Sequence, residues 1–162
     1  MTAAQSDSSP AGLIDITTLK DSLDGRRLPG ATLTIEPFQS VLADYALLAD
    51  GDDTGDAHPL WGLVLALRGM GISVDELCTL AGQRPQDVLL FGNCEIIAHR
   101  PLRVGATIDV TAMIEPVSRK ETRHGGFLDF VTVRTAFIDR ADSSGDPVGE
   151  VVNGFIFKRG AQ

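Results

Sequence analysis

One imidazole and several carboxylates lie close together in the sequence, immediately before an apolar stretch. Residues 50–58 read DGDDTGDAH, so that four aspartates precede His58, and Pro59 then leads into the apolar residues 60–67. A carboxylate and an imidazole on one short loop suit general acid–base catalysis, and the start of a helix offers amides that can hold a developing negative charge. The same residues suit a solvated turn in which His58 only caps a helix, because aspartate and glycine are common in turns. Both interpretations stay open from these residues alone.

The apolar stretch itself predicts a central helix. Proline is tolerated at the first position of a helix, so a helix is expected to start at Pro59 with His58 at its N-cap. Residues 60–67 are apolar on every side except at Gly62. This pattern is typical of a helix that is buried all round, and such a helix requires a sheet to cover it.

Further helices are predicted on either side of this stretch. Residues 15–23 suit a short helix, 28–30 a turn and 32–35 a short strand. Apolar residues then recur at helical spacing from Phe38 to Ala49, which predicts an amphipathic helix that begins near Pro37. Ser73 and Glu76 match a capping box, so another helix is expected from Val74 to Ala81.

The second half of the chain changes to a period of two, which predicts strands. Glycine-containing turns separate four of them, at residues 91–99, 107–117, 127–138 and 149–158. They are predicted to form an antiparallel meander. Helices followed by a long antiparallel sheet indicate an α+β protein with one domain over residues 12–162, after a disordered segment at 1–11.

Composition narrows the possible functions. The 162 residues are 43% hydrophobic and carry a net charge of -8, which favours a soluble cytoplasmic protein and argues against binding to nucleic acid or to a membrane. The two cysteines, Cys78 and Cys94, lack metal-type spacing and are expected to be buried apolar residues. We expect no metal site and no tightly held cofactor.

The strand region resembles a known family. The segment from His99 to Gly105, the basic turn at 119–126 and the strand at 127–133 are similar to those of MaoC-like hydratases and dehydratases. These are proteins of the hotdog fold, in which an antiparallel sheet curls around a central helix and usually pairs edge to edge with a second chain. They act on acyl thioesters of coenzyme A or acyl carrier protein.

The resemblance implies a catalytic pair. Active members carry the motif Y-x-x-x-S-G-D-x-N-P-x-H, and Asp53 and His58 have its aspartate-to-histidine spacing behind Tyr45. Gly55 and Asp56 stand where the motif has Asn and Pro. His58 therefore matches either the catalytic histidine or the histidine of the turn that enters the central helix, with the catalytic loop lost.

The remaining site residues follow from the chemistry that such a reaction requires. Amides near Trp61 and Gly62 are expected to bind the thioester oxygen. Arg100 and Arg103 are expected to hold phosphates of coenzyme A, although a solvated strand face would accommodate these arginines equally well.

Three functions remain in view. The first is an (R)-specific enoyl-thioester hydratase or dehydratase that uses Asp53 and His58. The second is a non-catalytic hotdog subunit that shapes an acyl pocket in a heteromeric dehydratase. The third is an acyl-CoA thioesterase. We expect the chain to form a homodimer or a heterodimer with another hotdog chain, and to take an acyl thioester as its substrate.

Overall fold

The computed structural model describes residues 12–50 and 54–160 of the chain. The predicted disorder of residues 1–11 lies outside this part and stays a prediction. In the described residues, the helices are α1 (Ile16–Leu23), α2 (Pro37–Leu47), α3 (Trp61–Gly69) and α4 (Val74–Leu80), and the strands are β1 (Arg27–Thr34), β2 (Val88–Ala98), β3 (Thr107–Ile114), β4 (Ser118–Glu121), β5 (Phe127–Asp139) and β6 (Gly149–Arg159).

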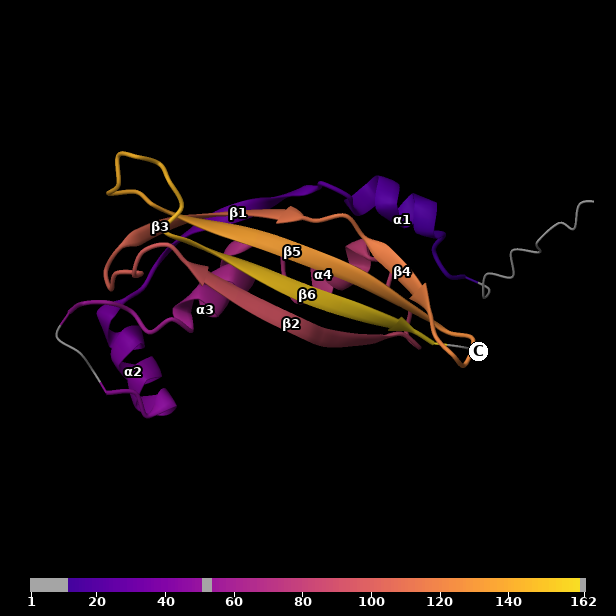
Figure 1. The fold of residues 1–162 in the computed structure, drawn as a ribbon, viewed down its shortest axis with the longest axis horizontal. Coiled ribbons are helices and arrows are strands. Elements are labelled where there is room, and N and C mark those ends of the chain that lie inside the picture. The colour runs from indigo at the N-terminus through magenta and orange to yellow at the C-terminus, as the bar shows by residue number, and fades with distance from the viewer. Residues whose placement is uncertain (1–11, 51–53, 161–162) are drawn as a thin grey trace, which may run out of the picture.

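The strands form one antiparallel sheet in the order β1-β3-β5-β6-β2, with β4 paired to β5. Helices α3 and α4 lie on one face of this sheet, which we call the inner face (Figure 1). The α+β class and the antiparallel sheet were predicted correctly. The simple meander is wrong, because β2 pairs with β6 at an edge of the sheet and not with β3. Residues 99–106, the crossing segment, join β2 to β3 and are too long for a hairpin loop.

Strand β1 begins earlier than predicted. The expected turn at Pro29 and Gly30 is a bulge inside β1, where the pairing with β3 shifts between Leu28 and Ala31. Gly30 has a φ of 70°, which a residue with a side chain rarely adopts. A glycine in the sequence therefore marked a bend in a strand and not its end.

Helix α3 is buried on one side and not all round. Leu65 and Ala66 are buried against the sheet, and the backbone of Gly69 approaches Val110 so closely that a Cβ would lie 2.7 Å from the valine side chain. By contrast, Leu63 and Val64 are half-buried and Arg68 is exposed. The single sheet covers only one flank of the helix, which explains the difference from the prediction.

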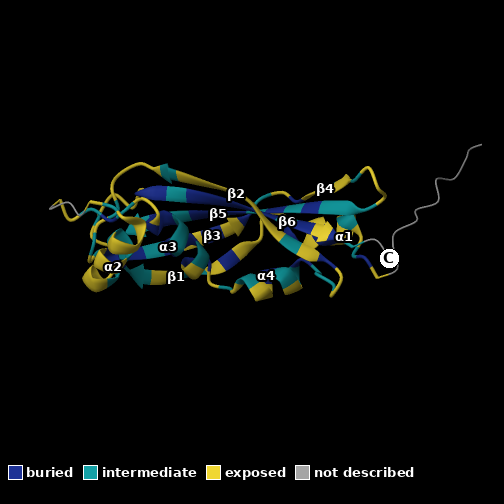
Figure 2. Cartoon of the chain, turned by 90° about the horizontal axis from the view of Figure 1, so that it is seen from below, coloured by how far each residue is buried: buried dark blue, intermediate teal, exposed yellow. Residues whose placement is uncertain are grey.

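The apolar stripe of α2 faces outward. Its exposed members include Val41 (67%) and Tyr45 (82%), and the only α2 residue that is buried is Ser40. Strand β2 is also exposed along most of its length, and Figure 2 shows this edge and α2 mainly in yellow and teal. The predicted helix is present, but the structure places its polar face inward.

One end of the sheet, where β6 ends, is held by a buried ionic network. The Arg159 guanidinium donates to Asp129 at 2.7 Å and to Asp87 at 3.0 Å, and these three side chains are fully buried. Arg159 also donates to the carbonyl of Ala81 at 2.7 Å, so that it ties the end of α4 to the sheet. Arg119 reaches the same Asp129 carboxylate from β4. We call this the distal end.

The Asp87 carboxylate shows the electrostatic effect of this network. Burial alone would raise its pKa, but hydrogen bonds from Arg84, Arg159 and the Gly160 amide hold the pKa well below its usual value. The network therefore favours the charged form of the Asp87 carboxylate.

Two general findings concern the described residues. Every helix among them is too short or too polar to cross a membrane. Their His, Cys, Asp and Glu side chains form no group of three that could hold a metal ion.

Candidate functional site

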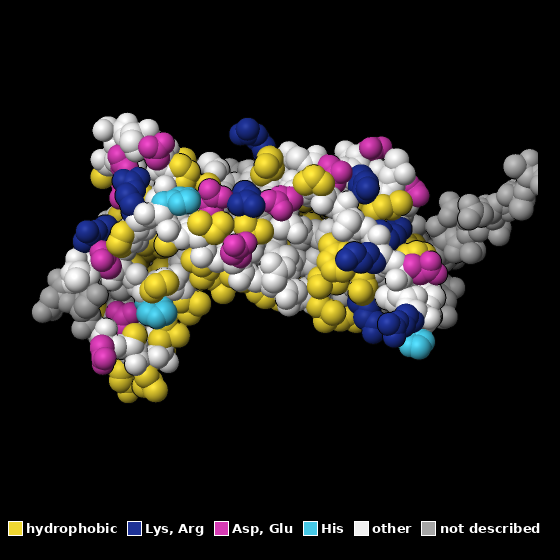
Figure 3. All heavy atoms as spheres, viewed as in Figure 1, with side chains coloured by type: hydrophobic (Ala, Val, Ile, Leu, Met, Phe, Trp, Pro, Cys, Tyr) yellow, Lys and Arg dark blue, Asp and Glu magenta, His cyan; other side chains and the backbone are white. Residues whose placement is uncertain are grey.

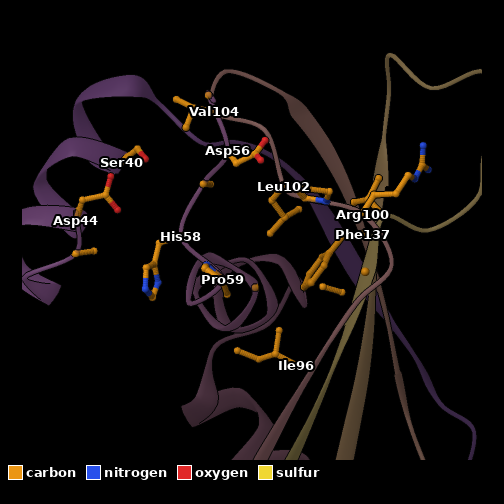
Figure 4. A pocket seen from close by; sticks show the side chains of 18 of the residues that line it. Ser40, Asp44, Asp56, His58, Pro59, Ile96, Arg100, Leu102, Val104 and Phe137 are labelled. Atoms are coloured by element: carbon orange, nitrogen blue, oxygen red, sulfur yellow. The ribbon is translucent and has the colours of Figure 1, made fainter. Parts of the chain in front are cut away.

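A pocket of about 700 Å³ opens at the end of the sheet opposite the distal end (Figure 4). It lies between α2, the segment before α3, the crossing segment and the ends of β2, β5 and β6. One side of the pocket is polar, with side chains from α2 and residues 56–58. Apart from His99 and Arg100, the rest is mainly apolar and includes Ile96, Leu102, Val104, Phe137 and Val148.

His58 lines the polar side of this pocket, and a local hydrogen bond sets its tautomer. Its Nδ1 accepts a hydrogen bond from the amide of Leu60 at 3.1 Å. A neutral imidazole whose Nδ1 is an acceptor carries its proton on Nε2. His58 therefore offers Nε2–H to the pocket as a hydrogen-bond donor.

The helix behind His58 starts two residues later than predicted. The carbonyl of His58 accepts from the Trp61 amide at 2.9 Å, and that of Pro59 accepts from the Gly62 amide at 3.0 Å. These bonds form a tight turn, and α3 begins only at Trp61. His58 caps this turn and not α3 itself. The two amides expected to hold a thioester oxygen are engaged by carbonyls, so they are not free donors.

Asp44 is a carboxylate on the same side of the pocket, and the sequence analysis missed it. It is half-buried and lies one helical turn after the buried Ser40 on α2. Figure 4 shows both side chains on the face of α2 nearest His58. The available signal was their i, i+4 spacing on the polar face of the predicted helix. It was unused because spacing alone does not show what that face contacts.

The predicted aspartate, Asp53, lies outside the described residues, so its role stays a prediction. Asp56 lines the pocket but forms an ion pair with Arg103 at 3.0 Å. Arg103 also donates to the carbonyl of Thr54 at 2.9 Å. It therefore fixes residues 54–56 to the crossing segment and is not among the residues that line the pocket.

Arg100 does line the pocket, at its edge. It pairs with Asp142 at 2.5 Å and donates to the carbonyl of Asp146 at 3.3 Å. The Ser144 amide, followed by Arg100, lowers the pKa of Asp142 below its usual value. The side chain of Arg100 is about half-exposed, and its ion pair with Asp142 holds it in place and partly balances its charge.

Trp61 and Gly62 lie in different environments. The Trp61 side chain is 7% exposed and lines a second cavity of about 290 Å³ between β1, α2 and α3. Gly62 lines the main pocket, where a Cβ would lie 3.2 Å from Ile96 and 3.4 Å from Val151. The absence of a side chain at position 62 keeps this part of the pocket open.

Comparisons with known proteins now identify the architecture. No protein-family profile and no curated protein matches the sequence. Among solved structures, the HadBC (3R-hydroxyacyl-ACP dehydratase) complex of Mycobacterium tuberculosis has a TM-score of 0.62 at 17% identity, with 85% of this chain and 98% of that chain covered. The chain has a hotdog fold.

Two further solved structures match the chain over most of its length. The ChsH1-ChsH2 complex of Mycobacterium tuberculosis has a TM-score of 0.62 at 15% identity, over 91% of both chains. The MaoC-like dehydratase of Rhodospirillum rubrum has a TM-score of 0.51 at 15% identity, over 89% of this chain and 98% of that chain. The resemblance predicted from the strand region is thus confirmed at the level of the hotdog fold. HadBC and ChsH1-ChsH2 are complexes of two different chains.

Proposed function

We propose that this chain is a MaoC-like enoyl-thioester hydratase or dehydratase that acts on acyl-CoA or acyl carrier protein thioesters. The observation that carries the proposal is the pocket, in which His58 and Asp44 lie together at the polar side of an apolar space of about 700 Å³. That volume suits an acyl chain. The polar side offers both a proton acceptor and a hydrogen-bond donor, which hydration of a double bond requires.

The reaction adds water across the double bond of a 2-enoyl thioester. The Asp44 carboxylate takes a proton from water while the water oxygen bonds to Cβ. The electron pair of the double bond then moves toward the thioester carbonyl and forms an enolate. The carboxylic acid returns its proton to Cα, so that one water is consumed and Asp44 is regenerated. Dehydration is the reverse.

His58 holds the reacting water in this scheme. Its Nε2–H donates a hydrogen bond and keeps its proton, since a neutral imidazole that lost it would become an anion. The Leu60 amide preserves this state, because it occupies Nδ1 throughout. The proposed product is the (R)-3-hydroxyacyl thioester, the configuration named for the HadBC dehydratase.

A second candidate is a non-catalytic subunit that shapes an acyl pocket beside a catalytic partner. The exposed apolar residues of α2 and β2 favour it, as does the assembly of HadBC and ChsH1-ChsH2 from two chains. In this case the pocket binds acyl groups, and His58 performs no chemistry.

The test is to incubate the purified chain with crotonyl-coenzyme A and follow enoyl absorbance and free thiol together. Hydration lowers the absorbance without thiol release, whereas a thioesterase releases thiol. Activity that appears only after a second hotdog chain is added, and that persists in His58→Asn, would favour the non-catalytic subunit.

A further inference from the structure

The crossing segment contacts both of the segments that carry the polar residues of the pocket. Its residues 102–104 run antiparallel beside residues 55–57, which lead to His58. The amide of Gly105 donates to the carbonyl of Ile35 at 2.8 Å, just before α2, the helix of Asp44. His58 and Asp44 are therefore both held against one short piece of backbone.

The pairing with residues 55–57 is a short antiparallel ladder. The amide of Ala57 donates to the carbonyl of Leu102 at 2.7 Å, and the amide of Val104 donates to the carbonyl of Gly55 at 3.0 Å. All four residues line the pocket, and Figure 4 shows the side chains of Leu102 and Val104 beside it. The ladder is thus part of the pocket wall, and a shift of one segment moves the other.

Arg103 reinforces this ladder with its side chain. It stands opposite Asp56, between the two backbone hydrogen bonds, where the side chains of an antiparallel pair are closest. Its guanidinium lies 3.0 Å from the Asp56 carboxylate and donates to the carbonyl of Thr54 at 2.9 Å. The Oδ1 atom of Asp56 is shielded from solvent and accepts no well-aligned hydrogen bond within the described residues. The charge of Arg103 therefore compensates a buried carboxylate oxygen.

The two arginines of the crossing segment are already in ion pairs. Arg103 pairs with Asp56 and Arg100 pairs with Asp142. Figure 3 shows dark blue side chains beside magenta ones at the pocket end of the molecule, to the left in this view. A guanidinium whose charge is balanced by a carboxylate has less to offer an anionic ligand. The contacts of Arg103 thus favour a role within the protein over the binding of a phosphate.

Helix α2 relies on the crossing segment for its position. Ser40 is its only buried residue, so side-chain packing does little to hold the helix. Ile35 precedes the helix and is fully buried, and its carbonyl is attached to the crossing segment through Gly105. In the proposed reaction Asp44 and His58 act on one water molecule, and a misplacement of about 1 Å can lower a rate about a hundredfold. The crossing segment therefore sets the geometry on which this reaction depends.

The first residues of the crossing segment are fastened to the sheet. The amides of His99 and Arg100 both donate to the carbonyl of Val148, at 3.0 and 2.9 Å. The Val148 amide donates in turn to the carbonyl of Phe137 at the end of β5, at 2.8 Å. The segment is thus anchored to the sheet at one end and supports the two polar segments of the pocket at the other.

We propose that Arg103 is a positioning residue, which holds residues 54–58 against the crossing segment through Asp56 and the Thr54 carbonyl and thereby fixes His58 relative to Asp44. The catalytic consequence rests on the proposed function, whereas the holding of residues 54–58 does not.

The first test compares the hydration kinetics of Arg103→Ala and of the unmodified full chain with crotonyl-coenzyme A. We expect kcat to fall about tenfold and KM to change little, because the apolar wall of the pocket remains. Arg140→Ala is the matched control, since Arg140 has an ion pair with Asp109 outside this pocket and a similarly exposed side chain, 57% against 58% for Arg103. Its kinetics should equal those of the unmodified chain. An unchanged kcat in Arg103→Ala would overturn the catalytic part.

The second test replaces the ion pair by a covalent bond in the double variant Asp56→Cys, Arg103→Cys. Opposite residues at such a position lie about 4.5 Å apart between Cα atoms, which a disulfide can span. Oxidation should restore most of kcat, and reduction should lower it to the level of Arg103→Ala. The unmodified chain, given the same oxidant, controls for Cys78 and Cys94. Continued slow turnover after the loss of two thiols is confirmed would refute positioning as the role of Arg103.

The third test measures amide hydrogen exchange by mass spectrometry and is independent of catalysis. Exchange over residues 54–58 should be several-fold faster in Arg103→Ala than in the unmodified chain, and unchanged in Arg140→Ala. Equal exchange in all three proteins would overturn the holding of this segment. If exchange is faster but even the unmodified chain fails to hydrate the substrate, the proposed function is refuted and the holding role is supported.

Discussion

The Nδ1 atom of His58 accepts the amide hydrogen of Leu60 at 3.1 Å, and this bond fixes the tautomer of the imidazole within the turn before α3. The bond makes His58 a donor to the pocket. A carboxylate must then take the proton from water, and Asp44 is the half-buried candidate on the same side of the pocket.

Replacement of Asp44 by Asn should lower kcat for hydration by a factor on the order of 100 to 10,000, because an amide cannot take a proton from water. The thermal midpoint should change little, as the two side chains have the same shape. The Asp50→Asn variant provides a control at the edge of the same pocket. Normal activity in Asp44→Asn together with an inactive Asp53→Asn variant would assign the base to Asp53.

The sequence predicted the element types of this hotdog chain better than the orientation of their faces. Regular spacing revealed α2, but it could not show that the sheet already buries its inner face and leaves Tyr45 outside. The pocket aspartate was missed for the same reason, because spacing identifies which residues share a face and not what that face contacts. The sequence analysis expected His58 at the N-cap of the central helix, but α3 begins at Trp61 and His58 caps the turn before it. A His-Pro pair marks a turn into a helix but does not distinguish these two positions.

The buried network at the distal end should be sensitive to the loss of one charge. Asp129→Asn is expected to destabilise the protein by about 3–5 kcal/mol, because the guanidinium groups of Arg119 and Arg159 would lose a buried counter-charge. Urea unfolding measures the effect. Glu150→Gln, in a partly exposed pair with Arg134, should cost below about 1 kcal/mol. If Asp129→Asn also cost below about 1 kcal/mol, the described packing would be contradicted.

Asp87 should make stability depend on acid pH. Its pKa is lowered in the folded protein, so its contribution to the free energy of unfolding is fully present above the unfolded-state pKa, about 4, and is lost as the pH falls toward the folded-state value. The unmodified chain should therefore lose stability below about pH 4. Asp87→Asn should be less stable at pH 7 and show a flatter dependence in urea unfolding from pH 7 to 3. If the free energy of unfolding fell equally with pH in both proteins, the role assigned to Asp87 would be contradicted.

Gly62 should set the width of the acyl pocket. In Gly62→Ala the new methyl would lie 3.2 Å from Ile96, which requires a small shift of that side chain and narrows the apolar wall. We expect KM to rise several-fold for longer enoyl thioesters and to change little for the four-carbon substrate. Comparison of crotonyl- and octenoyl-coenzyme A tests this, and an equal effect on both would show that the acyl chain does not pass Gly62.

The most direct test is hydration of crotonyl-coenzyme A by the purified chain and by His58→Asn. Asparagine retains a side-chain oxygen that can accept the Leu60 amide, but it lacks the imidazole donor. The account predicts that the unmodified chain lowers enoyl absorbance without releasing thiol, and that His58→Asn remains folded while its kcat falls about 100-fold or more. Unchanged hydration by the folded His58→Asn protein would contradict the assignment of this pocket as a catalytic site.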